Sequence, residues 1–231
     1  MMPVGPRRVA VAIAGITVAG LAWSASGLAQ GKRPPDADRG AVIAAQGTAG
    51  VPACAQCHGF SGASDSSGAF PRIAGQPAHY LEKQMQEFAS PARMNAIMSP
   101  IAKALSANDI ADVSHYYANI SGQFLPLASA DAALVNKGRE LARVGDAAKG
   151  IQACNNCHGP DGAGIPPAIP YLAGQYAQYI VFELRMWQRG FRKNSPDSMA
   201  LVAKQLDDQQ IAAVAAYYQQ VRSPLSAATS Q

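Results

Sequence analysis

Apolar residues recur at three- and four-residue spacing in several segments of this chain, which is the pattern of amphipathic helices. The alternation of apolar and polar residues that marks a half-buried strand forms no clear run. The spacing predicts helices over residues 38–46, 77–89, 131–144 and 176–188. Two more helices are predicted to follow Ser106 and Asp207, because Ser106-x-x-Asp109 and Asp207-x-x-Gln210 are capping patterns. The sequence therefore predicts an all-α fold.

The pattern occurs twice along the chain. Segment 71–76, Pro-Arg-Ile-Ala-Gly-Gln, matches segment 170–175, Pro-Tyr-Leu-Ala-Gly-Gln, at an offset of 99 residues. The second copy then has two extra residues, and in the resulting register of 101 residues Met98 falls on Met199. Two copies with a period near 100 residues indicate an internal duplication into tandem domains rather than a solenoid of short repeats. We predict a first domain at residues 30–125, a linker at 126–130 and a second domain at 131–231.

Each copy contains the pattern C-x-x-C-H, and the two copies use all four cysteines of the chain. Two thiols three positions apart can each bond to one haem while the adjacent imidazole reaches the iron, so this pattern indicates a c-type haem attachment site. The sequence predicts two covalently bound haem c groups, with His58 and His158 as axial iron ligands. The predicted attachment residues are Cys54, Cys57, Cys154 and Cys157.

Other uses of paired cysteines fit this spacing less well. A four-cysteine zinc site usually separates its pairs by 15–20 residues, whereas these pairs are about a hundred residues apart and each has its own histidine. A thioredoxin-like dithiol would require a βαβ context, which the pattern does not contain. A haem would also explain how two domains of this size are stable with few large apolar side chains.

The second axial ligand of each iron is expected to be a methionine. The second copy has no histidine besides His158, so its candidates are Met186 and Met199. Met186 aligns with Glu87, whereas Met199 aligns with Met98. The duplication therefore selects Met98 and Met199, and thioether sulfur is a known haem ligand. Met85 and Met94 are expected to be packing residues. His79 and His115 are expected to be surface or packing residues, with ligation of the first iron in place of Met98 as the alternative.

Three further groups of matched residues have more than one interpretation. The carbonyl groups of Pro71 and Pro170 either accept the imidazole N–H of the iron ligands or belong to plain turns. The arginines Arg93 and Arg192 either pair with haem propionates or are solvated. The tyrosines pack against the haem or a helix, with a hydrogen bond across the domain interface as a further option; they are Tyr116, Tyr117, Tyr217 and Tyr218.

The N-terminus carries an export signal. Arg7 and Arg8 precede an apolar run over residues 9–22, and small residues at 27–29 offer a cleavage point, so residues 1–29 are predicted to be a signal peptide. An uncleaved membrane anchor is the alternative, but this run is shorter than the roughly 20 residues needed to span a bilayer. Export agrees with the motifs, because bacteria attach haem to thiols outside the cytoplasm. The expected location is the periplasm.

The net charge of the chain does not indicate nucleic-acid binding. The formal net charge is +4, and loss of Arg7 and Arg8 with the signal peptide leaves about +2, with no broad basic surface. The expected partners are redox proteins that dock on a local patch, and peripheral association with the membrane stays open. An iron that holds both histidine and methionine has no free position for substrate, so one-electron transfer is expected rather than catalysis.

These motifs together resemble a dihaem cytochrome c of the c4 type. The resemblance rests on the tandem C-x-x-C-H domains, the repeated Ala-Gly-Gln, the Arg-x-Asn segments before Met98 and Met199, and the paired tyrosines, and it covers residues 30–231. It implies a periplasmic carrier with two Met/His haem domains related by approximate two-fold symmetry. Its donor would be a redox protein such as a quinol-oxidising complex or a dehydrogenase, and its acceptor a terminal oxidase or another redox protein. The alternatives are a haem-bearing subunit of a dehydrogenase complex, and an enzyme or sensor with an open haem.

Overall fold

The computed structural model describes residues 1–2, 5, 33–65, 67–122, 124–125, 127 and 129–222. The predicted signal peptide, apart from Met1, Met2 and Gly5, lies outside the described residues, as do two residues of the predicted linker. Within the described ranges, no helix is both long enough and apolar enough to cross a membrane.

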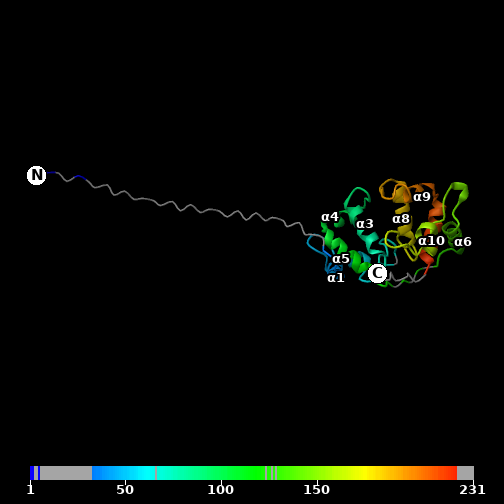
Figure 1. Cartoon of the computed structure of the whole chain (residues 1–231), viewed down its shortest axis with the longest axis horizontal. Helices are drawn as coiled ribbons and strands as arrows, with labels where there is room; N and C mark the ends of the chain where they lie inside the picture. Colours follow the sequence, from blue (N-terminus) through cyan, green and yellow to red (C-terminus); the bar gives the residue numbers. More distant parts are fainter. Residues whose placement is uncertain are drawn as a thin grey trace. The chain divides into compact units, whose positions relative to one another are not determined.

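The fold is all-α, as predicted, and consists of one helical pattern repeated (Figure 1). The helices of the first half are α1 (Ala37–Gln46), α2 (Ala55–His58), α3 (Ala78–Ala89), α4 (Met98–Ala104) and α5 (Ala107–Ala118). Those of the second half are α6 (Ala132–Arg143), η1 (Ala147–Lys149), α7 (Asn155–His158), η2 (Pro160–Gly162), α8 (Ala177–Gln188), α9 (Met199–Gln205) and α10 (Asp208–Gln220). Each predicted helix is present. In the part of the chain that the structure describes, β pairing is limited to isolated bridges.

The last helix of each half begins with the predicted capping box. At the start of α5, the Ser106 side chain accepts from the Asp109 backbone N–H, and the Asp109 side chain accepts from the Ser106 backbone. Asp207 and Gln210 form the same reciprocal pair at the start of α10. Both boxes satisfy amide protons of the first turn that no helical carbonyl can reach.

Each half packs its first helix closely against its last helix, and a glycine lies at each crossing. Gly40 of α1 faces the carbonyl of Asp112 in α5, and Gly138 of α6 faces the carbonyl of Ala213 in α10. A methyl group at Gly138 would lie 1.9 Å from the Ala213 oxygen, far inside van der Waals contact. The glycines therefore set how closely the two helices of each pair approach.

We expect Gly138→Ala to destabilise the second half. At an exposed helix position, alanine is more favourable than glycine by about 1 kcal/mol. Here the added methyl group must push α6 away from α10, and overpacking of this kind costs about 1–3 kcal/mol or more. Thermal unfolding followed by circular dichroism should show a lower Tm than for the matched control Arg139→Ala, an exposed position of the same helix. A Tm equal to or above that of the parent chain would contradict the proposed close approach.

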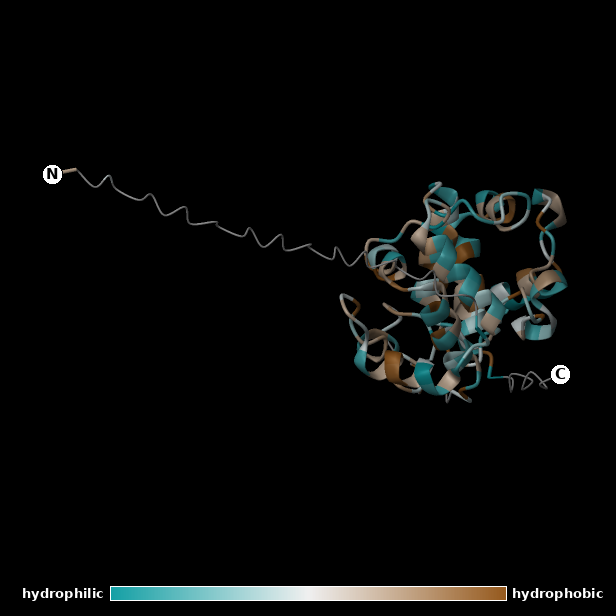
Figure 2. Ribbon diagram, turned by 60° about the vertical axis from the view of Figure 1, so that its left-hand side comes forward, coloured by the Kyte–Doolittle hydropathy of each residue, from teal (hydrophilic) through white to brown (hydrophobic). Residues whose placement is uncertain are grey.

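Apolar side chains form one core cluster in each half, and the cluster of the second half is larger. The first contains Ile43, Val51, Leu105, Ile110 and Val113. The second contains thirteen buried residues, among them Trp187, Tyr217 and Tyr218. Figure 2 shows apolar and polar residues mixed along the helices, as expected when each helix turns one side to a core. Small cores of this kind suit domains that gain further apolar contact from a cofactor.

Candidate haem sites

Both C-x-x-C-H motifs form a single helical turn with the same hydrogen bonds. In each, the histidine N–H donates to the carbonyl of the first cysteine at 3.0 Å, and the N–H of the second cysteine donates to it at 3.2 Å. A helical turn places residues three positions apart on one side, so the two thiols of each motif share a face. All four thiols are free, and the described residues contain no cluster of three or more metal-ligating side chains that would hold zinc.

The histidine of each motif is buried and oriented by a proline carbonyl. His58 Nδ1 lies 3.2 Å from the Pro71 oxygen, and His158 Nδ1 lies 2.9 Å from the Pro170 oxygen. A carbonyl oxygen can only accept, so each Nδ1 carries the proton and Nε2 is left as the ligand nitrogen. Burial lowers the pKa of both imidazoles, against the opposing effect of the carbonyl bonds. The neutral imidazole that iron binds is therefore favoured, and of the two interpretations of the prolines, the hydrogen-bonding one is confirmed.

A glycine-rich loop follows each motif and is held by the terminal tyrosines of its own half. Tyr116 donates to the Phe60 carbonyl at 3.1 Å, and Tyr217 donates to Asp161 at 2.8 Å. Tyr117 donates to the Gly59 carbonyl of the first loop, whereas Tyr218 donates to the Asn155 side chain, inside the second C-x-x-C-H motif itself. The hydrogen bond across the domain interface that was considered for these tyrosines is wrong. Each hydroxyl bonds instead to the loop or the haem motif of its own half.

Met98 and Met199 occupy the same position in the two halves. Each is the first residue of a short helix, α4 or α9, and each is half-buried. In the first half, the Asn95 side chain accepts from the Met98 backbone N–H at 2.8 Å and fixes the start of α4. Met199 packs against the core cluster of the second half.

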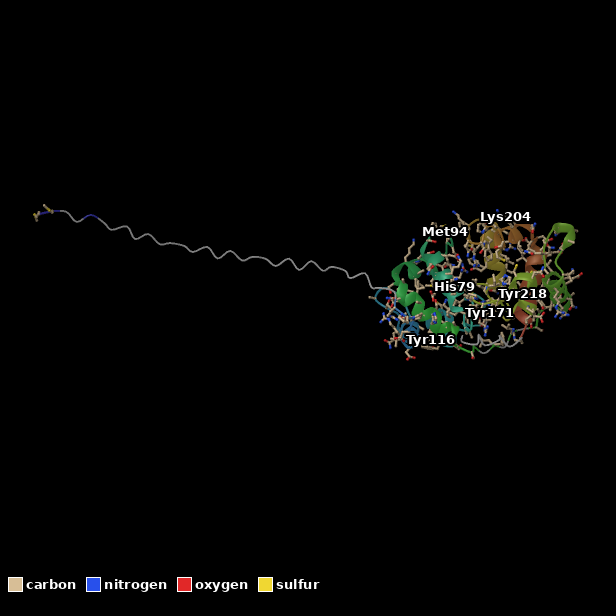
Figure 3. All side chains as sticks on the ribbon, in the orientation of Figure 1. His79, Met94, Tyr116, Tyr171, Lys204 and Tyr218 are labelled. Atoms are coloured by element: carbon tan, nitrogen blue, oxygen red, sulfur yellow. The ribbon has the colours of Figure 1, made fainter. Side chains whose placement is uncertain are left out.

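The other methionines and histidines differ in their exposure. Met85 packs against the first core cluster, as predicted. The prediction that Met94 is a packing residue is wrong, because the residue is 47% exposed (Figure 3). His79 is exposed at the start of α3, and His115 lies 3.4 Å from Glu82 at the surface, so both are surface residues as expected.

Arg93 and Arg192 are buried in a charge cluster between the halves, so the solvated interpretation is wrong. Both donate to the carboxylate of Glu183, at 2.7 and 2.5 Å, and both donate to the side-chain oxygen of Gln84, at 2.8 and 2.9 Å. Burial opposes charge on Glu183, but the two guanidinium groups outweigh it and lower the pKa of this carboxyl. We call these four residues the arginine cluster. Position 84 aligns with position 183 and position 93 with position 192, so the cluster consists of two matched pairs of the duplication.

The residues present fit a covalently bound haem in each half. Each motif has two free thiols next to a buried imidazole whose Nδ1, not Nε2, bonds to the proline carbonyl, and a matched methionine lies in each half. Arg72, 2% exposed, also has Nε and Nη1 atoms with no hydrogen-bond partner in the described structure. A buried cation with unused donors suits an acidic group such as a haem propionate.

A duplicated all-α chain with two such sites is a dihaem c-type cytochrome. It belongs to the cytochrome c family, whose sequence model, "Cytochrome c", matches residues 37–121 and 146–222, and within that family to the cytochrome c4 type. The cytochrome c4 of Pseudomonas aeruginosa is 38% identical over 76% of this chain and 87% of its own length. A "Thiosulfate dehydrogenase electron acceptor" of Thiomonas intermedia is also 38% identical, over 77% of this chain and 83% of its own.

Two solved structures share the fold. The reduced cytochrome c4 from Pseudomonas stutzeri has a TM-score of 0.71 and 32% identity, covering 81% of this chain and all of that one. The thiosulfate dehydrogenase TsdBA from Marichromatium purpuratum has a TM-score of 0.74 and 37% identity over 83% of this chain. This chain spans only 41% of the TsdBA chain. These relatives confirm two covalent haem c groups, an electron-carrying function and a redox protein as partner.

Proposed function

We propose that this chain is a periplasmic carrier in which each half binds one haem c and holds one transferable electron. The first haem would be attached to Cys54 and Cys57, with His58 and Met98 on its iron. The second would be attached to Cys154 and Cys157, with His158 and Met199 on its iron. The observation that carries the proposal is the duplicated site, in which a buried imidazole bonded to a proline carbonyl stands beside two free thiols.

The haem supplies the one-electron chemistry when bound. The chain's residues determine the protonation and orientation of the ligand histidines and the pair of ligands on each iron. Burial of His58 and His158 keeps both imidazoles neutral, and the proline carbonyls fix their orientation. Histidine and methionine together favour a relatively high reduction potential and leave no position for a substrate. Such sites change oxidation state with little rearrangement, which suits a carrier.

The location, domain bounds and partners form part of the same proposal. Residues 1–29 would direct export and be removed, leaving domains at 30–125 and 131–231 joined by residues 126–130. The donor would be a redox protein such as a quinol-oxidising complex or a dehydrogenase, and the acceptor a terminal oxidase or another redox protein.

A second candidate function is a haem-bearing subunit of a periplasmic dehydrogenase complex. Two relatives called "Thiosulfate dehydrogenase electron acceptor", 38% and 40% identical, favour it, as does the likeness to TsdBA. The two candidates differ in how the exported protein exists. A carrier should elute alone at the size of one chain, whereas a subunit should co-elute with a catalytic chain.

The first test is a visible spectrum of the haem-loaded protein, oxidised, then reduced, then exposed to carbon monoxide. We expect two low-spin haems per chain, a sulfur-to-iron band in the oxidised form and no response to carbon monoxide, because both irons hold two protein ligands. A missing sulfur band or a carbon monoxide shift would show an open iron and would exclude the proposed carrier.

A further inference from the structure

The peptide group that orients each iron-ligand histidine also makes a hydrogen bond to the opposite half. The Pro71 carbonyl, which accepts from His58, and the Arg72 N–H are the two ends of one peptide group. That N–H donates to the side-chain oxygen of Gln175 at 2.9 Å. Gln175 belongs to the second half, so the bond crosses the domain interface.

The reverse connection is present for the second histidine. The Pro170 carbonyl accepts from His158, and the N–H of the same peptide group, at Tyr171, donates to the Gln76 side-chain oxygen at 3.2 Å. Gln76 and Gln175 are the matched glutamines of the repeated Ala-Gly-Gln segments. The two connections are thus related by the duplication. In one, a glutamine of the second half binds a peptide group of the first half, and in the other the halves are exchanged.

Both glutamines are held firmly in this position. Each is 4% exposed. Each amide nitrogen also donates to the carbonyl of the residue whose N–H the glutamine oxygen accepts, in the opposite half. Gln175 Nε2 lies 2.8 Å from the Arg72 oxygen, and Gln76 Nε2 lies 3.0 Å from the Tyr171 oxygen. The paired bonds fix the glutamine oxygens on the peptide N–H groups.

We propose that Gln175 and Gln76 are positioning residues that tune the haem of the opposite domain through these peptide groups. A bond accepted by glutamine from the peptide N–H polarises the peptide and makes its carbonyl a stronger acceptor. A stronger acceptor draws the Nδ1 proton, makes the imidazole more basic and favours ferric over ferrous iron. Each domain therefore lowers the potential of its neighbour. This inference rests on the proposed function, because it needs His58 and His158 on the irons.

The test is a redox titration of the haem-loaded variants Gln175→Met and Gln76→Met. Methionine has nearly the shape of glutamine but offers the N–H no good acceptor. Gln175→Met is expected to raise the potential of the first haem, shifting its oxidation equilibrium about twofold, or roughly 18 mV for one electron. Gln76→Met is expected to raise the potential of the second haem instead. Haem methyl resonances, assigned through their contacts with Cys54 and Cys154, identify which haem has shifted.

The matched control is Tyr176→Phe, which removes a different bond across the interface, from the Tyr176 hydroxyl to the Ala63 carbonyl. It should leave the reduction potentials of both haems unchanged, because Ala63 is not part of either peptide connection. If Gln175→Met does not accumulate, Gln175→Glu keeps the acceptor oxygen and adds charge, and should lower the first potential more than the second.

The proposal is overturned if each glutamine variant shifts the haem of its own domain instead of the opposite one, or if both haems shift equally. It is also overturned if the control shifts the potentials as much as the glutamine variants do. An unmodified protein without two Met/His spectra would instead defeat the proposed function. The two failures can be told apart because the spectrum of the parent chain is recorded before any variant is titrated.

Discussion

Replacing Met199 with alanine should open the iron of the second haem while the first stays closed. Alanine cannot reach a metal, so under the proposed assignment His158 would remain as the single axial ligand. We expect carbon monoxide to bind half of the haems in the reduced variant, and the sulfur-to-iron band of the oxidised form to fall by about half. The potential of the second haem should also drop, because loss of the thioether removes the ligand that favours ferrous iron.

The matched control is Met186→Ala. Met186, in α8, is the other methionine that the sequence allowed as a ligand of the second iron, and it is also half-buried. Its removal should cost packing but leave the spectrum and the absence of carbon monoxide binding unchanged. If Met186→Ala opens the iron and Met199→Ala does not, the ligand assignment taken from the duplication is wrong.

Replacing Glu183 with glutamine should strongly destabilise the association of the two halves. The carboxylate is the only acidic group that bonds to Arg93 and Arg192 in the described structure, and all three residues are at most 7% exposed. Without it the arginine cluster would hold two buried positive charges and no negative one. Removing one partner of a buried ion pair typically costs about 3–5 kcal/mol, because the remaining charge is left uncompensated. Thermal unfolding of the haem-loaded variant should show a much lower Tm.

The symmetry of the arginine cluster offers a rescue. Gln84 occupies the matched position and already accepts from both arginines, at 2.8 and 2.9 Å. Moving the carboxylate there in the double variant Gln84→Glu, Glu183→Gln should restore most of the lost stability, since the cluster again holds one carboxylate between two arginines, as in the parent. A double variant no more stable than Glu183→Gln alone would refute the symmetric description. The single variant Gln84→Glu, which neutralises the cluster, should be tolerated.

Local patterns in the sequence were sufficient to predict the helices, the duplication and the haem motifs. Helical spacing depends on residues three and four apart, and each capping box spans only four residues, so Ser106 and Asp207 could be assigned without tertiary information. Likewise, the spacing of Cys154, Cys157 and His158 is set within one helical turn. The duplication extended this local information, because matching the copies selected Met199 over Met186.

The interface between the halves was decided only by the tertiary structure. The bonds of Gln76 and Gln175 join residues about a hundred positions apart, and no local periodicity records which surfaces of two copies will face each other. Arg93 looked like a surface or propionate-binding residue, because a charged side chain is buried only where partners compensate it. Its partner Glu183 comes from the other half of the chain. The sequence by itself thus determined that there are two haem sites, and the packing of one copy against the other decided which residues connect them.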